Sequence, residues 1–218
     1  MATVMTATLR RITESRTNYL IGYLIDFCCP CAFAYLGWRQ APSWALAMIC
    51  LPAGAFAFSW VEYAIHRWLF HSPSSFISPL HHTHHASPQE STALPCISSA
   101  VVGLALWPLA AGALGPGVAG FLLCGFFGWY FVYAALHHLE HHTAINHLPW
   151  RWLQRRWAAH IVHHRRADTN FGVTTSLWDR VCGTHYRSGK RRRGAPATRA
   201  GACPVSRLDT APDARAKP

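Results

Sequence analysis

The chain has 218 residues and a formal net charge of +11, yet only 13% of its residues are charged. A soluble domain usually has about 25% charged residues, and here the apolar residues are gathered into blocks long enough to cross a bilayer. These features exclude an ordinary soluble domain and, because the basic residues flank apolar blocks instead of forming a separate basic domain, they also exclude a nucleic-acid-binding protein.

Four apolar blocks predict four transmembrane helices, at about residues 19–38, 44–63, 95–114 and 118–136. A helix of this length spans roughly 30 Å, which matches the hydrocarbon core of a bilayer. Short turns at residues 39–43 and 112–117 join the helices into two hairpins. Asp26 interrupts the first block, and because a charge in lipid is costly, it should face the bundle. It is either a contact between helices, which we favour, or a functional acid.

The predicted helices belong to a membrane domain of residues 19–187. A cytosolic segment, residues 1–18, precedes this domain, and the composition of the basic tail, residues 188–218, predicts disorder. With four spans, both termini and the loop of residues 67–92 lie on one side of the membrane, and that side carries nearly all the Lys and Arg. The positive-inside rule therefore places it in the cytoplasm, together with a helical cap formed by residues 137–187.

All fifteen histidines lie between His66 and His185. Ten of them form four groups close to the ends of the predicted spans: His66 and His71; His81, His84 and His85; His137 and His141; His160, His163 and His164. Residues three or four apart on a helix share a face, so each of the last three groups should direct its rings into one space. His66 and His71 are about 140° apart on an ideal helix, so the helix must distort or end near His71, before Ser72 and Pro73.

Neutral imidazole is the commonest metal ligand in proteins. Ten histidines exceed the four-ligand shell of one zinc ion, so two metal ions are the economical inference, and imidazole suits iron as well as zinc. Four further residues are candidates to hydrogen-bond and orient these ligands: Glu62, Glu140, Asp168 and Asn170. Two alternatives stay open here, since Glu62 could also simply mark the membrane interface, and Asp168 and Asn170 also fit a turn before Phe171.

Four segments carry a resemblance to a known family: HRWLFH (66–71), HHTHH (81–85), YAALHHLEHH (133–142), and HIVHH (160–164) with NFGVTTSLWDRVCGT (170–184). They resemble the fatty acid hydroxylase and sterol desaturase superfamily over roughly residues 45–187, and look closest to the branch acting on sphingolipid acyl chains. The resemblance implies an all-α integral membrane oxygenase with the ten histidines holding a dinuclear centre on the cytosolic side of four membrane helices. The metals would normally be two iron ions, with zinc as a substitute acquired during expression.

The resemblance further implies O2-dependent hydroxylation of the acyl chain of a membrane lipid. The acyl-hydroxylase branch usually has Tyr-Asp before the third histidine group, whereas Tyr133 is followed here by Ala134. A sterol, carotenoid or lipid headgroup is the alternative acceptor, and desaturation is the alternative outcome. No fused cytochrome domain of the type found in some relatives is evident, so we expect a separate electron donor, either cytochrome b5-like or ferredoxin-like.

Three other classes of protein compete with this interpretation. His137 to His141 fit the H-x-x-E-H pattern of a zinc peptidase with Glu140 as the base, which leaves the other histidine groups unexplained. A haem electron carrier would need only one or two axial ligands. A metal transporter usually binds its cargo near the bilayer midplane, whereas these histidines lie at the ends of the predicted spans.

Overall fold

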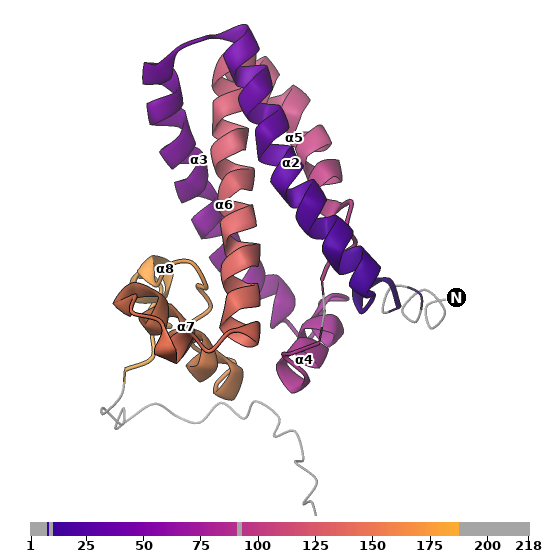
Figure 1. The fold of residues 1–218 in the computed structure, drawn as a ribbon, viewed down its shortest axis with the longest axis vertical. Coiled ribbons are helices and arrows are strands. Elements are labelled where there is room, and N and C mark those ends of the chain that lie inside the picture. Colours follow the sequence, from indigo (N-terminus) through magenta and orange to yellow (C-terminus); the bar gives the residue numbers. More distant parts are fainter. Residues whose placement is uncertain (1–7, 9–10, 91–92, 188–218) are drawn as a thin grey trace, which may run out of the picture. The chain divides into compact units, whose positions relative to one another are not determined.

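The structure is a computed structural model that describes residues 8, 11–90 and 93–187, and this part of the chain is helical (Figure 1). Its elements are α2 (Arg16–Gln40), α3 (Trp44–Ile65), η1 (His66–Phe70), α4 (Ser78–Ala86), α5 (Ser98–Leu114), α6 (Pro116–His142), η2 (Ile145–His147), α7 (Arg151–Arg165) and α8 (Leu177–Val181). The predicted disordered tail, residues 188–218, lies outside the described residues, as do most of the first ten.

Three of the four predicted spans are long and apolar enough to cross a membrane: α2, the continuous rod Trp44–Phe70, and α6. The predicted span of residues 95–114 forms α5, which has 17 residues and is shorter than the other three. The all-helical fold class is thus confirmed within the described residues, together with three candidate membrane spans.

Local sequence explains where these helices begin. The side chain of Ser15 accepts a hydrogen bond from the backbone of Asn18 at the start of α2, and Ser43 does the same for Leu46 at the start of α3. Serine is favoured at this position because its hydroxyl satisfies a backbone N–H that has no partner inside the helix. Gly115, with φ +81°, occupies the turn between α5 and α6, in the left-handed region that glycine adopts without a steric penalty.

Helix α6 is the centre of the bundle and packs against α2, α3 and α5 (Figure 1). Glycines allow its closest approaches: a Cβ atom added at Gly125 would lie 2.1 Å from the carbonyl oxygen of Leu51, and one at Gly120 would lie 2.4 Å from the Cα of Gly37. Small residues at such crossings let helix backbones come together, which is how helices in lipid associate without a hydrophobic driving force.

Gly125→Ala is therefore expected to destabilise the bundle by about 1–3 kcal/mol, because the new methyl group must push α3 away from α6. Gly128→Ala is the matched control on the same helix, since a Cβ there meets only Pro30, at 3.9 Å. Thermal unfolding of both variants in detergent measures the difference. Equal unfolding midpoints for the two variants would contradict the close crossing.

Helices α4, α7 and α8 lie at the end of the bundle where η1 and the last turns of α6 also lie (Figure 1). Helix α8 contacts α3 through Trp178, whose ring centroid is 4.8 Å from that of Trp60 and whose indole N–H donates to the Ser59 hydroxyl. The fold thereby brings every element that carries a histidine group to one end of the membrane helices.

Candidate metal centre

The structure brings the ten predicted histidines together as two clusters. The first cluster contains His66, His71, His81, His85 and His163, and the second contains His84, His137, His141, His160 and His164. Within each cluster, one ring nitrogen from every residue lies within 4.8 Å of the others. The remaining histidines lie outside both clusters: His82, His138, His142, His147 and His185.

Two of the histidine groups defined from the sequence are split between the two clusters. The expectation that each group directs its rings into one space is therefore wrong for these two groups. On α4, His81 and His85 face the first cluster while His84 faces the second, and α7 likewise sends His163 to the first and His164 to the second. Consecutive residues differ by about 100° around a helix, so one helix placed between two ions can serve both. Helices α4 and α7 therefore link the two sites.

The expected distortion between His66 and His71 is present. Residues 66–70 form a π-helical turn, and the backbone N–H of His71 donates to the carbonyl of His66 at 3.3 Å. This i→i+5 pattern places residues five apart about one turn above each other, and such turns are frequent at functional sites. The ring centroids of the two histidines are consequently 5.2 Å apart.

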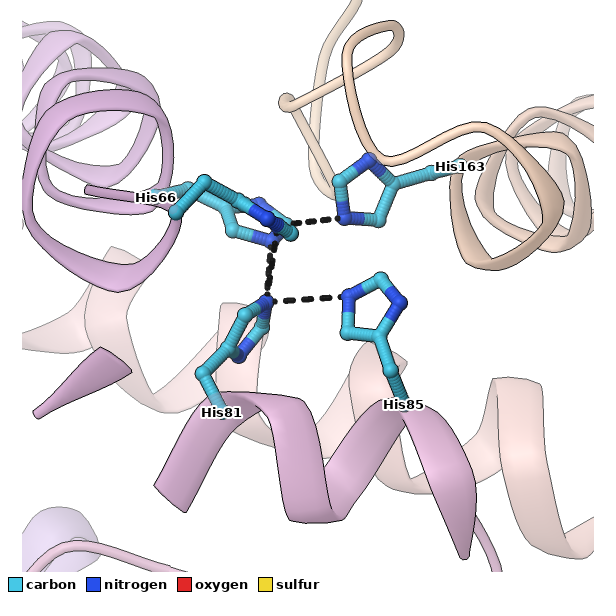
Figure 2. Close-up of side chains that lie close together, drawn as sticks. His66, His81, His85 and His163 are labelled. Carbon is cyan, nitrogen blue, oxygen red and sulfur yellow. Dashed lines mark hydrogen bonds between the residues drawn. The ribbon is translucent and has the colours of Figure 1, made fainter. Parts of the chain in front are cut away.

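The nitrogen atoms of the first cluster have the spacing of donors around one ion. Figure 2 shows the rings of His66, His81, His85 and His163 directed toward one another from η1, α4 and α7. His81 Nε2 lies 3.1 Å from His66 Nε2, 2.9 Å from His71 Nε2 and 3.0 Å from His85 Nε2. Two imidazole nitrogens bound at 2.0–2.1 Å to one cation are about 3 Å apart when they subtend a right angle.

Two backbone carbonyls determine the tautomers of the first cluster. His66 Nδ1 lies 2.5 Å from the carbonyl oxygen of Phe171, and His163 Nδ1 lies 2.7 Å from that of Thr169. Since a carbonyl only accepts, each Nδ1 must carry the hydrogen, and each Nε2 is left with a free lone pair. Both rings are therefore oriented as metal ligands by the segment that follows α7.

The clusters are electrostatically suited to cations. Burial, together with the repulsion of a second positive charge by neighbouring imidazoles, lowers the pKa of His84 to about 3 and the pKa of His85 to about 4. The rings are thus neutral at pH 7 and available as donors. In the second cluster, the buried His84 Nε2 has no hydrogen-bond partner among the described residues. A bound metal ion would supply the missing partner for this nitrogen.

The Glu62 carboxylate is hydrogen-bonded to the loop that orients His66 and not to the His66 ring. Its carboxylate accepts hydrogen bonds from the backbone N–H of Val173 at 2.6 Å, from that of Thr174 at 2.9 Å and from the Thr174 hydroxyl at 2.5 Å. Phe171, whose carbonyl contacts His66, lies in the same loop. Glu62 therefore acts on the first cluster indirectly.

The other candidate residues differ in what they contact. Asn170, at φ +54°, donates to the Ala159 carbonyl at 3.2 Å and accepts from the Tyr186 backbone at 2.8 Å, so it fixes the turn before Phe171. Asp168 is exposed. Its negative charge raises the pKa of His163 and so offsets part of the larger lowering that burial causes.

Glu140 is buried, with Oε2 3.7 Å from His160 Nδ1. His160 directs its other nitrogen, Nε2, toward His141 Nε2 at 2.8 Å. The carboxylate thus lies behind a cluster histidine instead of facing an open ligand position. This position, and the five histidines that share the cluster, argue against the zinc peptidase.

Asp179 is a positioning residue that no sequence pattern singled out. It is buried and accepts hydrogen bonds from the backbone of Phe171 at 2.8 Å, the backbone of Gly172 at 3.0 Å and the hydroxyl of Thr184 at 2.8 Å. Asp179 lies within the NFGVTTSLWDRVCGT segment, which resembles the family, and this position could have indicated a role. Its hydrogen-bond partners, however, are visible only in the folded loop.

Asp179→Ala should weaken metal binding to the first cluster by roughly 10- to 100-fold, because the Phe171 carbonyl would lose its fixed position against His66. Metal titration of the purified chain, followed by elemental analysis, measures the change. Asp168→Ala is the matched control, since it removes a carboxylate from the exposed side of the same segment. Equal metal retention by both variants would rule out this role for Asp179.

A cavity of about 220 Å³ adjoins the histidines and extends into the helical bundle. His84, His137 and His141 of the second cluster line one part of it, and His81 of the first cluster also reaches it. Elsewhere its lining includes the apolar side chains of Phe58, Ile65, Phe70, Ile77 and Leu80. The arrangement joins a candidate metal centre to an apolar space inside the membrane helices.

Comparison with known proteins agrees with this arrangement. Residues 51–184 match the sequence profile of the family described as Fatty acid hydroxylase. The chain is 32% identical over 140 residues to dihydroceramide fatty acyl 2-hydroxylase FAH2 of Arabidopsis thaliana, covering 60% of this chain and 58% of that protein. It is also 31% identical over 137 residues to fatty acid 2-hydroxylase of Rattus norvegicus, covering 58% of this chain and 36% of that protein.

A yeast relative provides a structural comparison. The chain is 32% identical over 151 residues to ceramide very long chain fatty acid hydroxylase SCS7 of Saccharomyces cerevisiae, covering 61% of this chain and 36% of that protein. A solved structure described as full length scs7p, with only the hydroxylase domain visible, superposes with a TM-score of 0.67 at 23% identity, covering 78% of this chain and 67% of that one. This likeness supports the fold.

Proposed function

The chain belongs to the fatty acid hydroxylase family, and we propose that it is a membrane-bound, non-haem di-iron enzyme that hydroxylates a lipid acyl chain with O2. One observation carries the proposal: two five-histidine clusters adjoin an apolar cavity within membrane helices. Such a cavity can hold a hydrocarbon chain against the clusters without moving it through water.

We propose all ten clustered histidines as the ligands, five for each ion. Imidazole suits iron, and two iron ions would supply the O2-dependent chemistry that an unactivated C–H bond requires. The protein's own contribution is positional: Phe171 and Thr169 hold ligand tautomers through their carbonyls, and Glu62 and Asp179 hold the loop that carries Phe171.

We also propose that α5 spans the membrane with the other three helices. A Cβ at Gly117, just after the α5–α6 turn, would lie 2.4 Å from the Ala41 Cβ in the α2–α3 turn, so the two hairpins end side by side. Seventeen residues rise roughly 26 Å, which is sufficient when flanking residues complete the crossing. By the positive-inside rule, the clusters would then face the cytoplasm.

The relatives' names point to N-acyl sphingolipids as the lipid class, and we propose such an acyl chain as the substrate. Hydroxylation by O2 also consumes reducing equivalents, which we propose come from a cytochrome b5-like or ferredoxin-like donor.

Lipid mass spectrometry of a host expressing the chain tests this function, beside a host expressing the His84→Ala, His85→Ala variant. A lipid that gains one oxygen atom only with the intact chain is the expected result, and its fragments identify the oxidised chain. Elemental analysis of the purified chain should give two iron ions. Oxygen added to a sterol, carotenoid or headgroup would replace the acyl substrate, and loss of two hydrogens would indicate a desaturase.

A further inference from the structure

A polar group lies in the wall of the cavity, deeper in the bundle than the histidines. Asp26 of α2 is only 8% exposed, and its Oδ1 accepts a hydrogen bond from the Ser99 hydroxyl of α5 at 2.5 Å. Tyr130 of α6 interacts with the same carboxyl group. All three residues line the cavity, so three different helices direct polar atoms to one place beside an apolar space.

This group lies within reach of a lipid bound at the second cluster. Tyr130 precedes His137 by seven residues on α6, a rise of roughly 10 Å along the helix. The same cavity touches both residues, so one ligand can contact the histidine cluster and the polar group together. The Tyr23 hydroxyl, between these two levels, is occupied because it donates to the Ala134 carbonyl at 2.7 Å.

The available atoms of this group are mainly hydrogen-bond acceptors. The Ser99 and Tyr130 hydroxyls each donate their only hydrogen to Asp26, and these two bonds use two of the roughly four lone-pair sites of a carboxylate. Polar groups buried in an apolar cavity are costly unless they are hydrogen-bonded. A ligand that complements them therefore brings an O–H or N–H donor.

We propose that Asp26, with Ser99 and Tyr130, forms a subsite that binds a hydrogen-bond donor of the lipid substrate, either a hydroxyl or an amide N–H. This rests on the proposed lipid hydroxylase function and adds a residue that selects the substrate. Helix α2 lies outside residues 51–184, the stretch that matches the family's sequence profile, so Asp26 is not among the residues that this profile covers. Asp26 is then a substrate-binding acid as well as a contact between α2 and α5.

A competition experiment on the purified full-length chain tests the subsite. The chain is incubated in mixed micelles with equal amounts of N-palmitoyl sphinganine, which has hydroxyls and an amide N–H, and palmityl palmitate, which has no donor. The chain is then repurified, and the bound lipids are quantified by mass spectrometry. We expect the wild-type chain to favour the amide lipid by roughly tenfold, as one additional buried hydrogen bond allows.

Asp26→Leu should reduce that preference to about one, and Asp26→Asn should reduce it partly, because one acceptor oxygen is replaced by a donor. Ser59→Ala is the matched control, since Ser59 is buried and hydrogen-bonded in α3 but does not line the cavity. Thermal midpoints measured in parallel separate loss of folding from loss of selection. A wild-type preference near one, or a preference unchanged in a folded Asp26→Leu variant, would overturn the subsite.

Hydroxylation of the bound lipids, measured with a chemical reductant and O2, distinguishes the two proposals. Oxidised product without donor preference would retain the enzyme and reject the subsite. Donor-selective binding by an iron-loaded chain that yields no oxidised lipid would retain the subsite and reject the hydroxylase.

Discussion

His160→Ala and His163→Ala are each expected to reduce the metal content from two ions to about one and to lower lipid hydroxylation by at least roughly 100-fold, a loss larger than that caused by changing residues that only support ligands. The two residues are three apart on α7 but belong to different clusters, so each substitution should empty a different site. The double variant should retain no metal above background.

His147→Ala is the control for these variants, because it removes an exposed imidazole that lies outside both clusters and does not line the cavity. Elemental analysis and lipid mass spectrometry on the same preparations provide the two readouts. If either single variant keeps two ions, the assignment of that histidine is wrong. If each single variant loses both ions, the two clusters bind metal cooperatively and are not independent sites.

Glu62→Ala is expected to destabilise the protein by at least about 3 kcal/mol, because it leaves three buried donors on Val173 and Thr174 without their acceptor. The loop that carries Phe171 should then loosen, and the first cluster should lose its metal more readily than the second. Thermal unfolding and metal content per chain measure the two effects.

Glu62→Gln is the matched variant, since it keeps one carbonyl oxygen for the two backbone N–H groups and the same side-chain length. Its loss of stability should be clearly smaller than that of Glu62→Ala. A Glu62→Ala chain with wild-type stability and two bound ions would show that the loop is held by other contacts, with Asp179 the first to consider.

Much of the fold follows from local sequence. Apolar blocks with a serine before α2 and α3 and a glycine between α5 and α6 determine where those helices lie, because capping and propensity act over a few residues. The third block was predicted as a full span, yet its helix begins only at Ser98. Asn18 explains this: its side chain bonds the backbone of Leu94 and Cys96, residues far away in sequence, and holds them outside the helix.

Helical spacing predicted that histidines gather at one centre and exceed the needs of one ion, and the resemblance to a known family indicated which ten they are; both rest on local sequence. The folded chain was needed to show that His84 and His85 belong to different clusters and that the Glu62 carboxylate holds a loop instead of a ligand. Those outcomes depend on contacts such as the one between Glu62 and Val173, 111 residues apart. Periodicity places a side chain on a face of its helix, but the packing of distant helices decides what that face meets.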